Sequence, residues 1–110
     1  MQYLFLIRVD DDAEAPEDVD PGPWVSEMEA RGARLVGDRL RPPEDTRTVR
    51  VRNGEQLVTE GPFVEAKELI GGFDLIECAD ADEAVEIAGK HPVARFGSIE
   101  IRPLWPLFEE

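Results

Sequence analysis

The first nine residues carry apolar side chains on both faces of an extended segment. Tyr3, Phe5 and Ile7 alternate with Leu4 and Leu6, so each face presents large hydrophobic groups. A strand with two apolar faces is typical of a central strand that is covered from both sides. This segment therefore restricts the chain to a sheet in which residues 2–9 have apolar partners above and below.

Two helices are predicted from capping signals. Asp20 followed by Pro21 is typical of an N-cap with proline at the first helical position, and Gly32 is placed to end that helix. Asp80, with Glu83 three residues later, begins the second helix in a relative of the capping box. The second helix is expected to turn one face of small side chains towards a sheet: Ala81, Ala84, Val85 and Ala88.

The strongest local signal is the segment TRTVRVRNGEQLVTEG, which covers residues 46–61. Val49 and Val51 alternate with polar residues, and Asn53-Gly54 supplies the two residues of positive φ that a type I′ turn requires. The segment predicts a β-hairpin with one very polar face.

The order of the predicted elements is strand, helix, strand, inserted hairpin, strand, helix, strand. After the N-terminal strand, the strands are expected at residues 33–40, 70–79 and 98–104. This order is typical of an α+β, ferredoxin-like split βαβ sheet with two helices on one face. A chain of 110 residues has the size of one such domain.

A second copy of the chain is expected to cover the remaining apolar surface. Five large side chains cannot all point into one helix-covered face: Phe5, Ile7, Phe73, Ile76 and Ile101. The C-terminal tail adds Leu104, Trp105, Leu107 and Phe108, which should dock either on the chain's own core or on a second subunit. We therefore predict a homodimer.

Charge and composition exclude several functions. With 25 acidic and 12 basic residues the formal net charge is -13, which disfavours nucleic acids and anionic membranes as partners. One cysteine, Cys78, and one histidine, His91, leave no internal disulfide and no zinc site. The apolar N-terminus is too short to span a bilayer and lacks a basic region or cleavage site, and no phosphate loop occurs. We expect a cytoplasmic protein without a cofactor.

The candidate site combines carboxylates with arginines. Arginine binds carboxylates and phosphates through two parallel hydrogen bonds. The predicted ligand-binding residues are Arg50, Glu60, Phe63, Glu65, Lys67 and Arg102. The predicted catalytic residues are His91, Asp74 and Glu60, because a carboxyl group of raised pKa, or an imidazole, can transfer a proton near pH 7. Alternatively, the charged residues form ion pairs that fix the hairpin against the sheet.

His91 and Cys78 also have structural interpretations. His91 lies between a helix end and Pro92, where a charged imidazole would interact favourably with the helix dipole. Cys78 ends a strand and is expected to be a small buried side chain rather than a nucleophile.

Several ordered blocks resemble one family. The segment Glu60-Gly61-Pro62-Phe63 follows the hairpin and precedes Gly71-Gly72-Phe73. Together with MQYLFLI, AVEIAGKHP and IEIRPL in the same order, it resembles the YCII-related family, in particular its DGPF subgroup. The similarity covers nearly the whole chain. Glu60 stands where most members of the subgroup have aspartate, which keeps the carboxylate one methylene further out.

The resemblance implies a dimeric α/β barrel of ferredoxin-like subunits, with a ligand cleft where sheet, hairpin and helix end meet. In the wider family a His/Asp pair is suspected of catalysis, and distant relatives include a lyase that acts on a chlorinated aromatic. The leading hypothesis is a homodimer that binds a small polar or anionic metabolite, with cofactor-free acid/base chemistry of the lyase or isomerase type.

The alternative hypothesis is a non-catalytic interaction module. Members of the subgroup often occur near, or fused to, extracytoplasmic-function sigma factors. In this interpretation the acidic stretch from Asp10 to Asp20 is the surface that contacts a basic partner protein.

Overall fold

The computed structural model describes residues 1–10, 19–62 and 68–108. In this part of the chain six strands, two α-helices and two short 3-10 helices form. In chain order they are β1 Gln2–Asp10, α1 Gly22–Ala30, β2 Arg34–Arg39, η1 Pro43–Asp45, β3 Arg47–Arg52, β4 Glu55–Glu60, β5 Glu68–Glu77, α2 Ala81–Gly89, η2 Pro92–Arg95 and β6 Ser98–Pro103.

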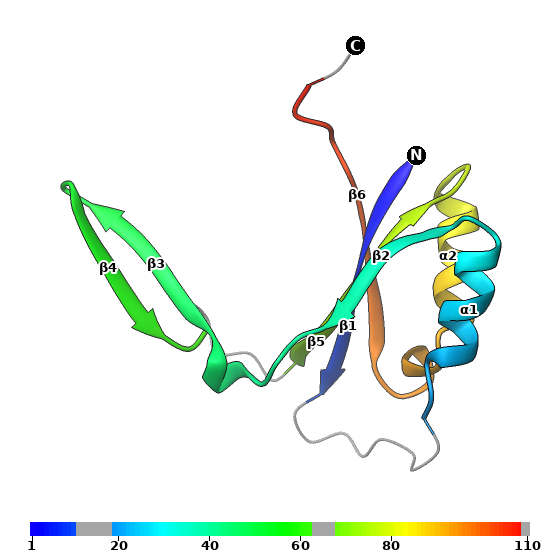
Figure 1. Ribbon diagram of the computed structural model, residues 1–110, viewed down its shortest axis with the longest axis horizontal. Helices are drawn as coiled ribbons and strands as arrows, with labels where there is room; N and C mark the ends of the chain where they lie inside the picture. The colour runs from blue at the N-terminus through cyan, green and yellow to red at the C-terminus, as the bar shows by residue number, and fades with distance from the viewer. Residues whose placement is uncertain (11–18, 63–67, 109–110) are drawn as a thin grey trace.

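The main sheet has four antiparallel strands in the order β2-β5-β1-β6. β1 is central, as its two apolar faces predict, and β3 and β4 form a separate hairpin inserted between β2 and β5 (Figure 1). The α+β class and the ferredoxin-like strand order expected from the sequence are therefore confirmed. Among the described residues, neither helix is long and apolar enough to cross a membrane.

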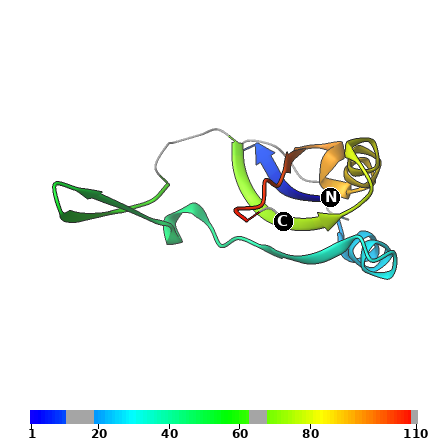
Figure 2. The ribbon, with the colours of Figure 1, turned by 90° about the horizontal axis from the view of Figure 1, so that it is seen from above.

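Both helices cover the same face of the main sheet and enclose the core (Figures 1 and 2). Tyr3 and Phe5 of β1 and Ile76 of β5 are buried beneath Met28 of α1 and Ile87 of α2. Register explains this, because Tyr3 faces Ile76 across the strands and Phe5 faces Ile101. Each such side chain contributes about 1.5–3 kcal/mol by leaving water.

The helix termini follow the predicted capping signals. The Asp80 carboxylate accepts a hydrogen bond from the backbone N–H of Glu83 at 2.9 Å, and Glu83 accepts one from the N–H of Ala79 at 3.2 Å. Asp20 accepts from the N–H of Gly22 at 2.9 Å, so the first helix begins one residue later than predicted. Gly32 has φ +72°, the left-handed conformation expected after a helix end.

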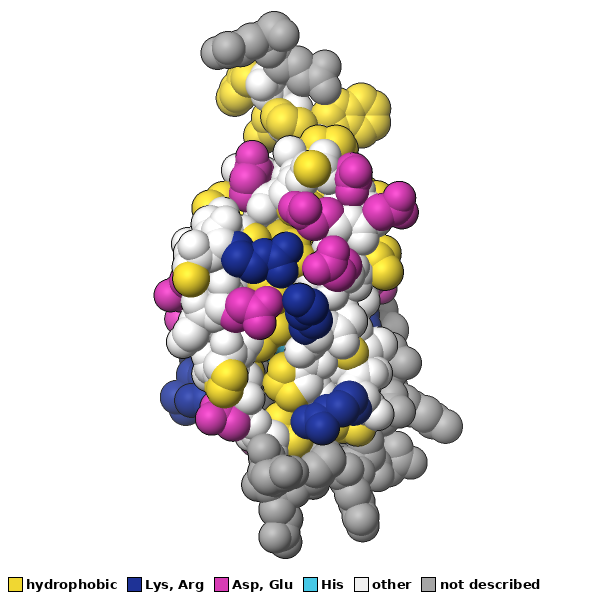
Figure 3. Space-filling model, turned by 90° about the vertical axis from the view of Figure 1, so that its right-hand side faces the viewer, with side chains coloured by type: hydrophobic (Ala, Val, Ile, Leu, Met, Phe, Trp, Pro, Cys, Tyr) yellow, Lys and Arg dark blue, Asp and Glu magenta, His cyan; other side chains and the backbone are white. Residues whose placement is uncertain are grey.

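The buried face of α2 differs from the prediction. Ala84, Ile87 and Ala88 are buried, whereas Val85 is 61% exposed. Val85 is one position from Ala84, and that step rotates its side chain about 100° around the helix, away from the sheet. Figure 3 shows acidic and basic side chains interspersed over the helix side, with hydrophobic side chains in the furrow between them.

The face of the main sheet away from the helices carries large apolar side chains and lacks a covering layer in the described chain. Leu4 lies opposite Leu75, and Leu6 lies opposite Phe73. All four are only partly buried, and we call them, with the 52% exposed Val36, the open face. Phe5, Ile7, Ile76 and Ile101 all point to the helix side, which corrects the expectation that they divide between the two faces. Only Phe73 of that set belongs to the open face.

The hairpin of residues 47–60, which we call the arm, extends away from the rest of the chain (Figures 1 and 2). Asn53 and Gly54 have φ +52° and +75°, as a type I′ turn requires. Of its residues, only Thr48 is even partly buried. The radius of gyration of 16.2 Å exceeds the value of about 13 Å for a compact domain of this length, because the arm projects.

The C-terminal tail lies in solvent. Trp105, Leu107 and Phe108 are 85%, 93% and 90% exposed. Docking on the chain's own core, one of the two expected arrangements, is therefore wrong. Docking on a second subunit remains a prediction.

Candidate functional site

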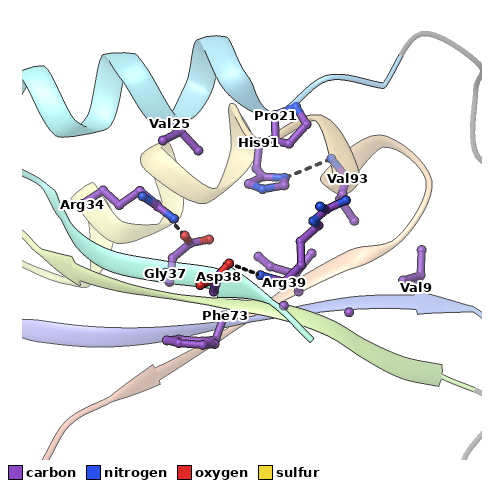
Figure 4. A pocket seen from close by; sticks show the side chains of 14 residues that line it. Val9, Pro21, Val25, Arg34, Gly37, Asp38, Arg39, Phe73, His91 and Val93 are labelled. Atoms are coloured by element: carbon purple, nitrogen blue, oxygen red, sulfur yellow. Dashed lines mark hydrogen bonds and ion pairs between the residues drawn. The ribbon is translucent and has the colours of Figure 1, made fainter. Parts of the chain in front are cut away.

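A cavity of about 330 Å³ lies between the helix-covered face of the main sheet and the ends of both helices (Figure 4). Strand β1 contributes Ile7 and Val9, the start of α1 contributes Pro21 and Val25, and the connection after α2 contributes His91. Its size suits a small metabolite, and most of its wall is hydrophobic.

Polar groups enter the cavity from β2 and β5. Arg34, Asp38 and Arg39 come from β2, and Asp74 comes from β5. β2 is the neighbour of β5 in the sheet, and Gly37 lies directly opposite Asp74. A Cβ atom at residue 37 would collide with the Asp74 carboxylate and lie 2.6 Å from Nη2 of Arg34. Gly37 therefore leaves the space in which Asp74 meets Arg34.

Asp74 is a buried carboxyl group, 5% exposed, held by one arginine. Nε of Arg34 donates to Oδ1 of Asp74 at 2.7 Å, and Nη1 of Arg34 donates to Glu29 at 2.8 Å. Burial raises the pKa of Asp74, and the nearby positive charge of Arg34 only partly opposes this increase. Asp74 is therefore fixed in position and binds a proton more readily than an exposed aspartate.

His91 forms part of the cavity roof and is also 5% exposed. Its ring packs against that of Trp24 in a T-shaped arrangement at a centroid distance of 4.6 Å, and its Nδ1 accepts a hydrogen bond from the N–H of Val93 at 3.0 Å. Burial lowers the pKa of His91 from 6.5 to about 4. The ring is therefore neutral at pH 7, and the expected favourable interaction of a charged imidazole with the helix dipole is wrong.

The hydrogen bond to Val93 also determines which nitrogen of His91 carries the proton. Because Nδ1 accepts, the neutral ring must carry its hydrogen on Nε2. Within the described part of the chain, Nε2 has no hydrogen-bond partner. His91 can thus donate a hydrogen bond to a ligand from Nε2. Accepting a proton is unfavourable for His91, because it would create a positively charged ring in a buried position.

Arg39 supplies a positive charge at the mouth of the cavity. Its side chain is exposed, and no ion pair joins it to another of the described residues. Figure 4 shows it on the same side of the sheet as His91. Sequence reasoning missed both Arg34 and Arg39. Regular alternation would place residues five apart on opposite faces. The register shift between Arg34 and Val36, together with the pairing of β2 with β5, brings both arginines to the cavity.

Comparison with known proteins places the chain in a family. Residues 1–108 match the YCII-related domain. The chain belongs to the YCII-related family. An uncharacterised protein of Rhizobium meliloti (strain 1021) is 46% identical to it over 68 residues, which cover 60% of this chain and 55% of that protein. The match thus spans about half of the relative's length.

In this YCII-related chain, only part of the residue set proposed from sequence reaches the cavity. Asp74 and His91 both line it. Arg50 and Glu60 lie on opposite faces of the arm, because Arg50 pairs with Leu57 and Glu60 with Arg47. Arg102 donates to Glu100 at 3.3 Å on the other side of the main sheet. The expectation that these residues share one cleft is not met within a single chain.

The remaining predicted site residues cannot be placed. Phe63, Glu65 and Lys67 lie outside the described residues, as does most of the acidic stretch before α1. Across residues 1–10, 19–62 and 68–108, no three His, Cys, Asp or Glu side chains are grouped so that they could hold a metal ion. Cys78 of this YCII-related chain is buried, as predicted, and burial raises the pKa of its thiol.

Proposed function

We propose that this YCII-related protein binds a small metabolite with an apolar body and one carboxylate group. The observation that carries the proposal is the cavity itself, where a hydrophobic wall is combined with the Arg39 guanidinium and the neutral N–H of His91. Arg39 attracts the carboxylate, and Nε2 of His91 donates a hydrogen bond to one of its oxygens. Apolar side chains such as Val9 and Val25 hold the body of the molecule.

The same arrangement supports cofactor-free acid/base chemistry of the isomerase or lyase type. Asp74 is the proposed group that removes and returns a proton, because its pKa is raised and Arg34 fixes its orientation. His91 is the proposed donor to the oxygen on which negative charge develops, since its neutral ring carries the N–H on Nε2. This assignment uses the Asp74 and His91 predicted from sequence but makes Asp74 the base.

A matched pair of arginine variants tests the binding proposal. We expect Arg39→Gln to weaken binding of benzoate by about tenfold, the usual effect of losing one charge-assisted contact. Arg102→Gln removes the same charge on the opposite side of the sheet and should leave binding unchanged. Isothermal calorimetry measures both. Absence of binding to the wild type at millimolar benzoate, or equal effects of the two variants, contradicts the proposal.

Proton transfer is tested with phenylpyruvate in deuterated water. If Asp74 removes a proton from C3 and the solvent returns a deuteron, proton NMR shows faster loss of the C3 signal with the wild type than with buffer. Asp74→Asn should return the rate to that of buffer, and a circular dichroism spectrum checks that this variant is folded. A wild-type rate equal to that of buffer restricts the function to binding.

We also propose that two copies pair through their open faces as a dimeric α/β barrel of the DGPF type. Leu4, Leu6, Phe73 and Leu75 support this pairing, because they form an apolar layer that no other part of residues 1–10, 19–62 and 68–108 covers. The positive φ of Gly61, +93°, supports membership of the subgroup, since its motif has glycine at this position.

A further inference from the structure

The arm has one face that is unsuited to solvent. The pairing of Val49 with Val58 and of Val51 with Gln56 places three valines on one face of the two-stranded ribbon. These valines are 59%, 52% and 57% exposed for residues 49, 58 and 51. A two-stranded ribbon without a packed face is only marginally stable in water. Within the described residues, the valine face of the arm therefore has no apolar layer to pack against.

The arm and the open face lie on the same side of the molecule. In two perpendicular views the helices are on one side of the main sheet and the arm extends from the other (Figures 1 and 2). A partner molecule that packs against Leu6 and Phe73 of the open face would occupy the angle between the open face and the arm. One occupant of that angle would lie against both the open face and the arm.

Charge and length favour a second copy of this chain as the occupant. Three arginines and two glutamates give the arm a charge of +1, whereas the rest of the chain, with 9 bases and 23 acids, carries -14. The six-residue strands of the arm are about 20 Å long, which matches the width of about 19 Å of a four-stranded sheet. A two-fold axis would give each arm the same contact on the other copy.

We propose that the valine face of the arm docks on the body of a second copy of this chain, so that two arms clasp the dimer reciprocally. The inference rests on the proposed pairing of open faces and adds a second contact to it. The ferredoxin-like fold does not require the inserted hairpin, and the inference assigns this hairpin a role.

Two neighbouring substitutions on β4 test the clasp. Val58→Asp puts a carboxylate on the valine face, and Thr59→Asp puts the same charge on the opposite face. By sedimentation equilibrium we expect Val58→Asp to raise the dissociation constant of the dimer at least about tenfold, because a charge would be buried against apolar side chains, and Thr59→Asp to change it less than about threefold. Both residues are exposed in the single chain, so neither substitution disturbs the core.

Hydrogen exchange provides the second measurement. Amides of residues 47–60 should exchange more slowly as the protein concentration rises, whereas those of α2, which covers the opposite face of the main sheet (Figure 1), should be less affected. A wild-type dimer in which the two variants behave alike overturns the clasp but leaves the pairing of open faces intact. If the wild type is a monomer at all concentrations, both the clasp and the pairing of open faces are wrong, whether or not another protein binds the arm.

Discussion

The main sheet and the arm are built from the same kind of strand but differ in what their side chains contact. In the main sheet Phe5 and Ile76 are fully buried beneath helices, whereas Val49 and Val58 of the arm face water. Both regions have regular antiparallel ladders. The difference shows that hydrogen-bonded pairing and turn residues suffice to define a hairpin, whereas stability requires a second layer.

The largest expected contrast concerns truncation of apolar side chains. Phe5→Ala should lower the free energy of unfolding by about 3–5 kcal/mol, because it leaves a cavity in the core. Val51→Ala in the arm should change it by less than about 0.5 kcal/mol at low protein concentration. Urea unfolding followed by tryptophan fluorescence measures both. Comparable losses would mean that the arm belongs to the same cooperative unit as the main sheet.

The next contrast concerns the stability of the folded chain at acidic pH. The pKa of His91 is about 4 in the folded chain and 6.5 in the unfolded chain, so the unfolded state binds more protons between these values. Its contribution to stability is complete above pH 6.5 and is lost as the pH falls to about 4. The free energy of unfolding is therefore expected to fall by about 3 kcal/mol through His91.

His91→Asn isolates this contribution, because asparagine can still accept from the N–H of Val93 but does not titrate. Urea titrations between pH 7 and pH 4 should show a weaker pH dependence for the variant. Protonation of Asp74, whose pKa is raised, acts in the opposite direction in both proteins. An unchanged pH dependence in the variant would contradict the assignment to His91.

The smallest expected effect concerns two glycines of positive φ, one beside the main sheet and one in the arm. Gly32 ends α1 and Gly54 lies in the turn of the arm, with φ +72° and +75°, and a Cβ atom would meet no neighbour at either position. Alanine should therefore cost the same amount locally, about 1–2 kcal/mol. Gly32→Ala should lower the global unfolding free energy by this amount. Gly54→Ala should instead speed amide exchange within residues 47–60, and an equal global loss would show that the arm is coupled to the core.

Local signals in the sequence predicted the fold well. The hairpin followed from Asn53-Gly54, and the second helix followed from Asp80 and Glu83, because turns and caps depend on residues close together in the chain. The buried face of α2 was harder to predict. Val85 and Ile87 are both apolar, and only their direction relative to the sheet decides which is buried.

The candidate site could be predicted only in part. Asp74 and His91 were chosen for their chemistry, and both line the cavity. Arg34 and Arg39 were missed because their place at the cavity depends on which strand lies beside β5 and on the register shift in β2. Arg50 was predicted to bind the ligand, but it lies on the arm. Its distance from the cavity depends on the direction in which the arm extends (Figure 1), and no local pattern indicates that direction. Long-range strand order is a tertiary property that no local motif contains.

The contact among Arg34, Gly37 and Asp74 has an evolutionary consequence. A relative that loses the Asp74 carboxylate leaves the Arg34 guanidinium with Glu29 as its remaining partner, and one that gains a side chain at position 37 displaces both Arg34 and Asp74. Single changes at these positions should therefore be selected against, whereas joint replacement is tolerated. Positions 34, 37 and 74 should be inherited as one unit among relatives that keep the cavity, and should diverge together in those that have given it up.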